Sequence, residues 1–175
     1  NDFTLIGQAV SSYAAGAVVS LAGKNEGGKT LSRSTVLAVL NDFALHFDPA
    51  HFRYIVLPSR MVAFARRVAT MAISDANKEI MLQSSSEMML GNLVTSLTLD
   101  EANPRRGQDG ADALQEACAG VLHELALYGP GAAALRAHTP TMDALRVLAE
   151  SGTKESRERA AGALFELDEE TRAKA

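Results

Sequence analysis

One stretch near the N-terminus has the residue types and the spacing of a phosphate-binding loop. Residues Gly23-Lys-Asn-Glu-Gly-Gly-Lys-Thr30 match the pattern G-x-x-x-x-G-K-[ST]. In such a loop the glycines, here Gly23 and Gly28, let backbone N–H groups surround phosphates. Lys29 then reaches the outer phosphates and the Thr30 hydroxyl binds Mg²⁺. With residues 17–21 as a preceding strand and residues 93–101 as a Walker B strand with its acidic pair, the pattern indicates a P-loop NTPase.

A second interpretation explains the same residues without a nucleotide. A shift of 104 places Gly16 on Gly120 and Thr35 on Thr139, so that residues 23–30 become a loop between two copies of a repeat. A parallel α/β domain needs several further buried strands rich in Val and Ile. After residue 101 the chain consists almost entirely of helix-forming residues. The NTPase therefore stays the alternative hypothesis.

Other residues with reactive side chains form no recognisable catalytic or metal-binding set. His46, His51, His123 and His138 lack the H-x-x-x-H spacing of a zinc site, and Cys118 is the only cysteine. The serines at 84–86 have no assigned base, and the methionines at 81, 88 and 89 are typical of core filling. We therefore predict no catalytic residue, no metal and no cofactor.

The clearest regularity in the chain is an internal repeat. Residues Leu114-Gln-Glu-Ala-Cys-Ala-Gly-Val-Leu-His-Glu-Leu125 return as Ser156-Arg-Glu-Arg-Ala-Ala-Gly-Ala-Leu-Phe-Glu-Leu167, a step of 42 residues from Gly120 to Gly162. A related copy, Ala14-Ala-Gly-Ala-Val-Val-Ser-Leu21, comes earlier. Small residues beside aliphatic residues at i, i+3 and i+4 indicate helices that approach their neighbours closely. A fixed-period repeat of helices predicts a stack.

These copies resemble the third helix of an armadillo repeat, whose usual pattern is A-x-G-x-L-x-N-L. The resemblance is clear over residues 110–167, with residues 130–137 and 141–152 similar to the first and second helices of one unit. It implies an all-α, right-handed superhelical solenoid of about four armadillo-like (or HEAT-like) units. The third helices are then expected near residues 3–22, 57–72, 110–127 and 154–167.

The resemblance also implies a function. Successive third helices of such a stack line a concave groove that binds a partner polypeptide, so we expect a non-catalytic protein-binding scaffold. The family's groove asparagine is here Ser20, Glu124 and Glu166, with Thr70 at the degenerate copy, which predicts a basic partner. Residues one or two turns earlier on the same face complete the expected partner-binding set: Tyr13, Arg66 and Arg159. The glycines of this face either open room for the partner or serve close helix packing.

The length and composition of the chain limit which folds, partners and locations are expected. The chain of 175 residues is long enough for one domain, residues 1–175, or a short solenoid. Its net charge of −4 argues against a nucleic-acid partner, which would call for a basic stripe. The sequence has no apolar run long enough for a membrane span, and its first 23 residues lack the charged n-region of a signal peptide. A cytoplasmic or nuclear location is expected. Because residues 3–22 would be a third helix without its first two, we also expect the natural protein to extend upstream.

Three local expectations complete the sequence reading. Residues 74–82 and 85–97 are expected to form two successive helices, and Thr153 is expected to be the N-cap of the last helix. Residues 100–110 have strong turn signals and little apolar material, which predicts an exposed and poorly ordered loop. The repeat also predicts that Ala15, Ala119 and Ala161 sit at tight helix contacts.

Overall fold

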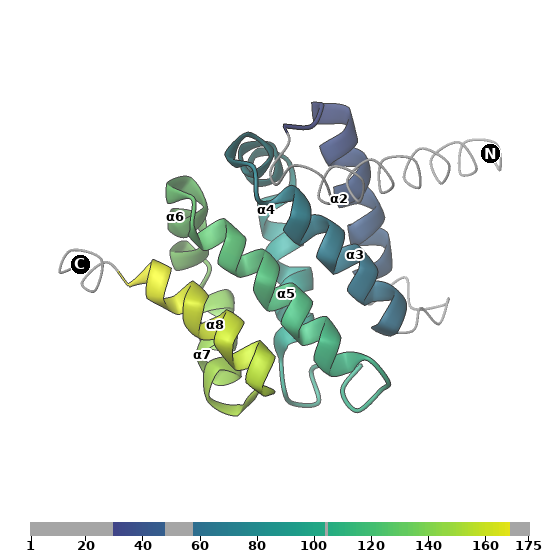
Figure 1. The fold of residues 1–175 in the computed structure, drawn as a ribbon, viewed down its shortest axis with the longest axis vertical. Coiled ribbons are helices and arrows are strands. Elements are labelled where there is room, and N and C mark those ends of the chain that lie inside the picture. The colour runs from purple at the N-terminus through teal and green to yellow at the C-terminus, as the bar shows by residue number, and fades with distance from the viewer. Residues whose placement is uncertain (1–29, 48–57, 104, 169–175) are drawn as a thin grey trace.

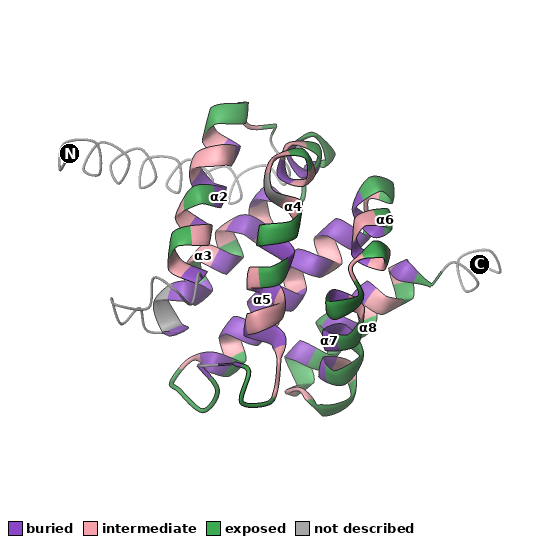
Figure 2. Cartoon of the chain, turned by 180° about the vertical axis from the view of Figure 1, so that it is seen from behind, coloured by how far each residue is buried: buried purple, intermediate pink, exposed green. Residues whose placement is uncertain are grey.

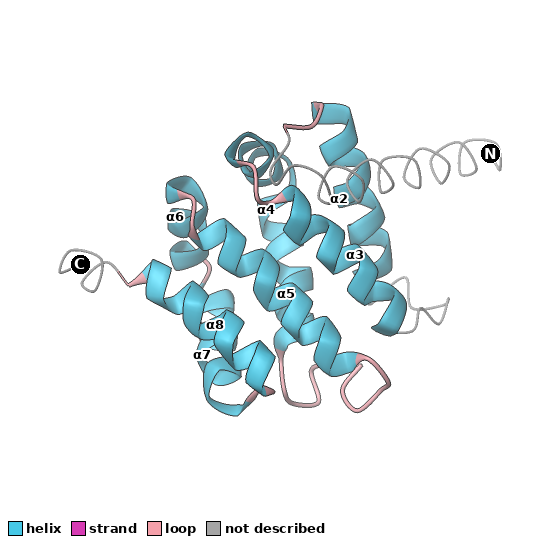
Figure 3. Ribbon diagram, in the orientation of Figure 1, coloured by secondary structure: helices cyan, strands magenta, loops and turns pink. Residues whose placement is uncertain are grey.

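The described part of the chain is helical throughout. The computed structural model describes residues 30–47, 58–103 and 105–168, which contain α2 (Arg33–Phe47), α3 (Pro58–Met71), α4 (Asp75–Leu97), α5 (Ala111–Ala126), α6 (Gly129–Ala137), α7 (Thr139–Ser151) and α8 (Lys154–Leu167), numbered as in Figure 1. No strand occurs among these residues (Figure 3). The all-α prediction is confirmed for them.

The seven helices form two layers. One layer consists of α3, α5 and α8, which lie side by side and run in the same direction (Figure 1). The other consists of α2, α4 and α7, which lie behind them and come to the front when the molecule is turned round (Figure 2). The contacts α2–α3, α4–α5 and α7–α8 join the layers, and the short helix α6 packs against α4, α5, α7 and α8. The expected third helices 57–72, 110–127 and 154–167 thus correspond to α3, α5 and α8.

The helix ends follow from residues near them. Pro130 and Pro140 stand in the first turns of α6 and α7, where a missing N–H costs no intrahelical hydrogen bond. Thr153 is the N-cap of α8 as predicted, because its Oγ1 accepts a hydrogen bond of 3.3 Å from the Ser156 backbone N–H. Gly110 precedes α5 with φ of 82°, a left-handed conformation that glycine adopts without strain.

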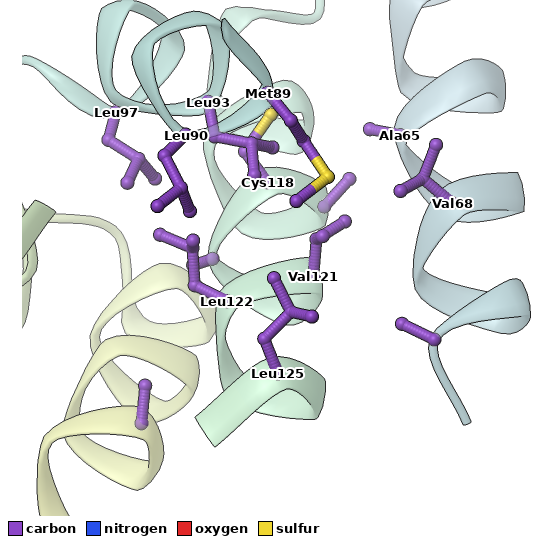
Figure 4. Close-up of a cluster of buried hydrophobic side chains, with 14 of the residues drawn as sticks. Ala65, Val68, Met89, Leu90, Leu93, Leu97, Cys118, Val121, Leu122 and Leu125 are labelled. Carbon is purple, nitrogen blue, oxygen red and sulfur yellow. The ribbon is translucent and has the colours of Figure 1, made fainter. Parts of the chain in front are cut away.

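The core lies between the two layers and is mainly aliphatic. In Figure 4, Leu90 and Leu93 of α4 and Val121 and Leu122 of α5 point into the same space, with Val68 of α3 at its side. All five side chains are buried. Because burial of aliphatic side chains is the main favourable term in folding, this shared core holds the two layers together.

Two helices expected at residues 74–82 and 85–97 are in fact one. Helix α4 runs without a break for 23 residues, so the prediction of a helix boundary near Ser84 is wrong. The sequence contains no proline or paired glycine between Asp75 and Leu97 that would interrupt a helix. Serine has only a modestly lower helix propensity than alanine, and the buried face of α4 continues through it. Met81, Met89 and Leu93 are all buried, which confirms core packing for two of the three clustered methionines.

The loop at residues 100–110 is anchored, contrary to the prediction that it has almost nothing to bury. The Arg105 side chain is only 2% exposed and Asn103 is 4% exposed. Asn103 Nδ2 donates to the carbonyl oxygens of Ser96 (3.4 Å) and Thr98 (3.2 Å), and its Oδ1 accepts from the Arg105 backbone N–H (3.0 Å). The Arg105 guanidinium donates to the carbonyl oxygen of His46 (3.4 Å). The loop is thereby fixed to the ends of α4 and α2.

The expected tight contact at Ala161 is also absent. Ala119 of α5 is fully buried, as predicted, but its repeat equivalent Ala161 is exposed on α8. The buried face of α8 consists of Ser156, Ala160, Ala163 and Leu167. The difference arises because α5 lies between α3 and α8, whereas α8 has, among the described helices of its layer, only α5 beside it. Ala15 lies outside the described residues.

Candidate functional site

The predicted partner-binding residues of the described chain all lie on helices of the α3, α5 and α8 layer. These residues are Arg66 and Thr70 of α3, Glu124 of α5, and Arg159 and Glu166 of α8. We call them, on their three neighbouring helices, the third-helix surface. The three helices are adjacent and run in the same direction (Figure 1). Tyr13 and Ser20 lie outside the described residues.

The side chains of this surface are accessible to different degrees. Arg66 and Arg159 are exposed, while Thr70, Glu124 and Glu166 are half-buried. The Thr70 hydroxyl donates a hydrogen bond of 2.9 Å to the Arg66 carbonyl oxygen on its own helix, which fixes its rotamer. The surface therefore presents basic side chains on α3 and α8 and carboxylates on α5 and α8. It could contact a polypeptide of mixed or basic charge.

The two glycines of this surface do different things. A Cβ atom added at Gly120 would meet no heavy atom within 4 Å, so this position is open. A Cβ added at Gly162 would lie 3.1 Å from Nε2 and 3.3 Å from Cε1 of His123. Of the two roles expected for glycine, close helix packing holds at Gly162, because His123 of α5 lies against it. Open space on the surface is found only at Gly120.

Two apolar residues of the surface are absent from the sequence-based set. Ile73 follows Thr70 by three residues and is 44% exposed, while Leu127 follows Glu124 by three residues and is 47% exposed. They occupy equivalent positions just beyond the C-terminal ends of α3 and α5. Each stands three residues after a predicted position, and this shared spacing in the sequence could have identified both. They add apolar contact area beside the polar residues.

The nucleotide-binding alternative requires a second strand, and the structure has a helix in its place. Residues Leu93 to Leu97 lie inside α4, so the Walker B strand that this alternative placed within residues 93–101 is not formed. Asp100 and Glu101 begin the anchored loop and are exposed. Thr30 is exposed and precedes α2, whereas Gly23, Gly28 and Lys29 lie outside the described residues.

His46 and Cys118 are engaged in packing within the fold. His46 stacks on Phe64 with ring centroids 4.1 Å apart, and its Nδ1 lies 2.7 Å from the Asp42 carbonyl oxygen. Burial raises the pKa of the Asp42 carboxyl, while His46 and Arg67 lower it. Burial also raises the pKa of the Cys118 thiol to about 12, against weaker opposing effects of the Ser96 hydrogen bond and the Arg105 charge. A neutral, fully buried thiol is a poor nucleophile.

The described residues contain no cluster that would hold a metal ion and no helix that could cross a membrane. No group of three or more His, Cys, Asp or Glu side chains is placed to hold a metal ion within the described ranges. Among the helices of those ranges, none is both long and apolar enough to span a bilayer.

One shallow depression lies away from the third-helix surface. It has a volume of about 550 Å³, and the described residues that line it belong to α4, among them Gln83, Ser84 and Glu87. Nearby, Arg33 donates hydrogen bonds to Gln83 Oε1 (3.3 Å) and Ser84 Oγ (3.4 Å). A lining that comes from one helix in the described part of the chain differs from most binding pockets, which enclose a small ligand between several elements.

Fold and site define the class of the molecule as an all-α protein built of two helical layers. Comparisons with protein-family models, with curated proteins and with solved structures give no significant match. The assignment of function therefore depends on the geometry of the third-helix surface.

Proposed function

We propose that this chain is a non-catalytic interaction scaffold, an armadillo-like superhelical stack whose third-helix surface binds an extended segment of a partner protein. One observation supports this proposal above the others. Repeat-equivalent side chains at Thr70, Glu124 and Glu166 stand on three adjacent helices that run in the same direction. Such an array repeats one contact at regular intervals, which suits a linear polypeptide rather than a compact ligand.

The spacing of the helices sets the spacing of the partner's contacts. Packed helices lie about 8–10 Å apart, and an extended chain advances about 3.3 Å per residue. A peptide crossing the layer therefore passes from one helix to the next in about three residues. Carboxylates at Glu124 and Glu166 favour Lys or Arg side chains at that interval. Ile73 and Leu127 favour apolar residues near them.

The proposal is tested with a peptide array in which Lys or Arg recurs every two, three or four residues. We expect the three-residue series to bind best, and the double variant Glu124→Gln/Glu166→Gln to lose that binding, as the wild type does when salt is added. The control is Glu87→Gln/Glu150→Gln, which removes the same charge from exposed positions on α4 and α7 of the other layer. Equal losses in the two double variants would place the contact surface elsewhere.

The P-loop alternative has its own test. Only a ligand that binds the folded state raises the melting temperature, so Mg²⁺ with ATP or GTP should leave the melting temperature of the scaffold unchanged. A dose-dependent increase that Lys29→Ala abolishes would support nucleotide binding at Gly23–Thr30 instead.

A further inference from the structure

The thioether of Met88 is the most accessible sulfur of the protein. All six methionines of the chain lie in the described ranges, and Met88 is 55% exposed. Met142 is partly buried against the core, and the remaining four methionines are at most 2% exposed: Met61, Met71, Met81 and Met89. The single cysteine, Cys118, is fully buried. An oxidant that meets the folded protein therefore reaches the sulfur of Met88 before the others.

The position of Met88 on α4 accounts for its exposure. Successive residues of a helix are turned by about 100°, so Met88 points away from the core while Met89 beside it points into the core (Figure 4). Ser84 stands one turn before Met88 on the helix, and Gly91 stands one turn after it. Both residues are small, and a Cβ added at Gly91 would meet nothing within 4 Å. Neither neighbour covers the thioether.

The surroundings of Met88 also suit the oxidised form. Met88 lines the shallow depression on α4 together with the polar side chains of Gln83, Ser84 and Glu87. A sulfoxide formed there stays in contact with water and polar groups, so it costs the fold little. At Met89 the same polar group would be buried among aliphatic side chains, which destabilises a core. Met88 is thus a position at which the folded protein tolerates oxidation.

We propose that Met88 is a reversible oxidation site, oxidised by hydrogen peroxide while the protein stays folded and restored by a thiol-dependent sulfoxide reductase. The sulfur lone pair attacks one peroxide oxygen, the O–O bond breaks, and the other oxygen leaves as water. In the reverse direction two thiols supply two electrons and two protons, the sulfoxide oxygen leaves as water, and a disulfide forms on the reductant. The exchange converts an apolar side chain on the outer side of α4 into a polar one. Because α4 belongs to the other layer, this inference is independent of peptide binding at the third-helix surface.

The first measurement is the uptake of oxygen from dilute hydrogen peroxide by the folded, full-length chain. Intact mass gives the rate, and fragment spectra distinguish Met88 from Met89. We expect Met88 to react at least about tenfold faster than any other methionine, because a buried sulfur is reached only when the fold opens locally. In urea the six methionines should react at similar rates. Another methionine that reacts first in the folded protein, or the same selectivity in urea, would overturn the proposal.

Two conservative variants identify the sulfur that reacts. Met88→Leu should lose the fast uptake of the first oxygen. The matched control is Met89→Leu, which removes the neighbouring buried sulfur at nearly constant volume and should keep the fast uptake. A Met88→Leu variant that gains its first oxygen at the wild-type rate would show that the site lies elsewhere.

A further measurement tests whether the fold tolerates the sulfoxide and whether the oxidation is reversed. The singly oxidised protein should keep the helix content and the melting temperature of the unmodified protein by circular dichroism. The two classes of methionine sulfoxide reductase each accept one sulfoxide epimer, so both together with dithiothreitol should restore the original mass without urea. A lowered melting temperature, or a sulfoxide that is reduced only after unfolding, would show that Met88 is not a reversible site of the folded protein.

Discussion

The imidazole of His123 lies against Gly162, where an added Cβ would come within 3.1 Å of Nε2. This contact joins α5 to α8 and leaves little spare room at one of two equivalent repeat positions. At Gly120 an added Cβ would meet nothing within 4 Å. The same residue type thus supports close packing in one copy and leaves open space in the other.

The first prediction uses this difference. Gly120→Ala should raise the free energy of unfolding by up to about 1 kcal/mol, because alanine has the higher helix propensity and there is room for its methyl group. Gly162→Ala should raise it less, since His123 must move by a few tenths of an ångström. Urea unfolding of both variants, and of Gly162→Ala in a His123→Ala background, measures the effect. Equal gains from the two single substitutions would show that His123 does not restrict this position.

The second prediction concerns the equivalent alanines of α5 and α8. Ala119→Leu should lower the free energy of unfolding by about 1–3 kcal/mol, because the added atoms overpack a fully buried site. Ala161→Leu should change it by no more than about 0.5 kcal/mol in dilute solution, because Ala161 is exposed. Urea unfolding of the two variants at low protein concentration tests this, and a similar loss at Ala161 would mean that its face is covered within one chain.

The third prediction concerns the loop that Arg105 anchors. Trypsin must extract a side chain that is 2% exposed to cut after Arg105, whereas Arg106 beside it is exposed. Mass spectrometry of brief digests should therefore show cleavage after Arg106 well before cleavage after Arg105. Arg105→Ala removes the hydrogen bond to His46 and should cost about 1–3 kcal/mol of stability and speed cleavage after Arg106. An unchanged cleavage rate in Arg105→Ala would contradict the anchoring role.

The fourth prediction follows from the buried thiol of Cys118. Its pKa is raised from 9.0 to about 12 by burial, so the folded state keeps a proton that the unfolded state releases. The corresponding stability is fully present below pH 9 and is lost as pH rises toward 12. Urea unfolding between pH 8 and pH 11 should show a steeper fall for the wild type than for Cys118→Ala. Parallel curves would mean that the thiol does not contribute, and a thiol reagent should react only on unfolding.

Much of the layer α3, α5 and α8 could be predicted from the sequence, for local reasons. The repeated glycine and alanine positions and the aliphatic spacing predicted these three helices to within a residue or two of their observed ends. The continuity of α4 was missed because three consecutive serines resemble a break, although nothing in them prevents a helix. Such a segment stays helical when its apolar face has neighbours to pack against.

The remaining differences between the predicted and the observed structure depend on contacts with other helices rather than on local sequence. Arg105 carries a charge and stands among turn residues, so the sequence indicates solvent, yet its guanidinium reaches the end of α2 and lies 5.9 Å from the Phe47 ring centroid. Ala161 repeats Ala119 in sequence but not in burial, because burial is decided by whether another helix lies alongside. The predicted surface residues lie on one layer because their helices pack side by side. Ile73 and Leu127 were missed because they stand three residues beyond the predicted positions.

Helix α4 also affects how the molecule unfolds. In a simple repeat array each unit contacts only its nearest neighbours, so the ends can open independently. Here one uninterrupted helix contacts α2 on one side and α6 and α7 on the other, as well as α5. If the helices on one side of α4 unfold, part of α4 is exposed to solvent. Its packing against the helices on the other side is then weakened. We therefore expect the amide protons of α4 to exchange together in a single cooperative opening, in place of the graded exchange from the ends inward that independent repeats would give.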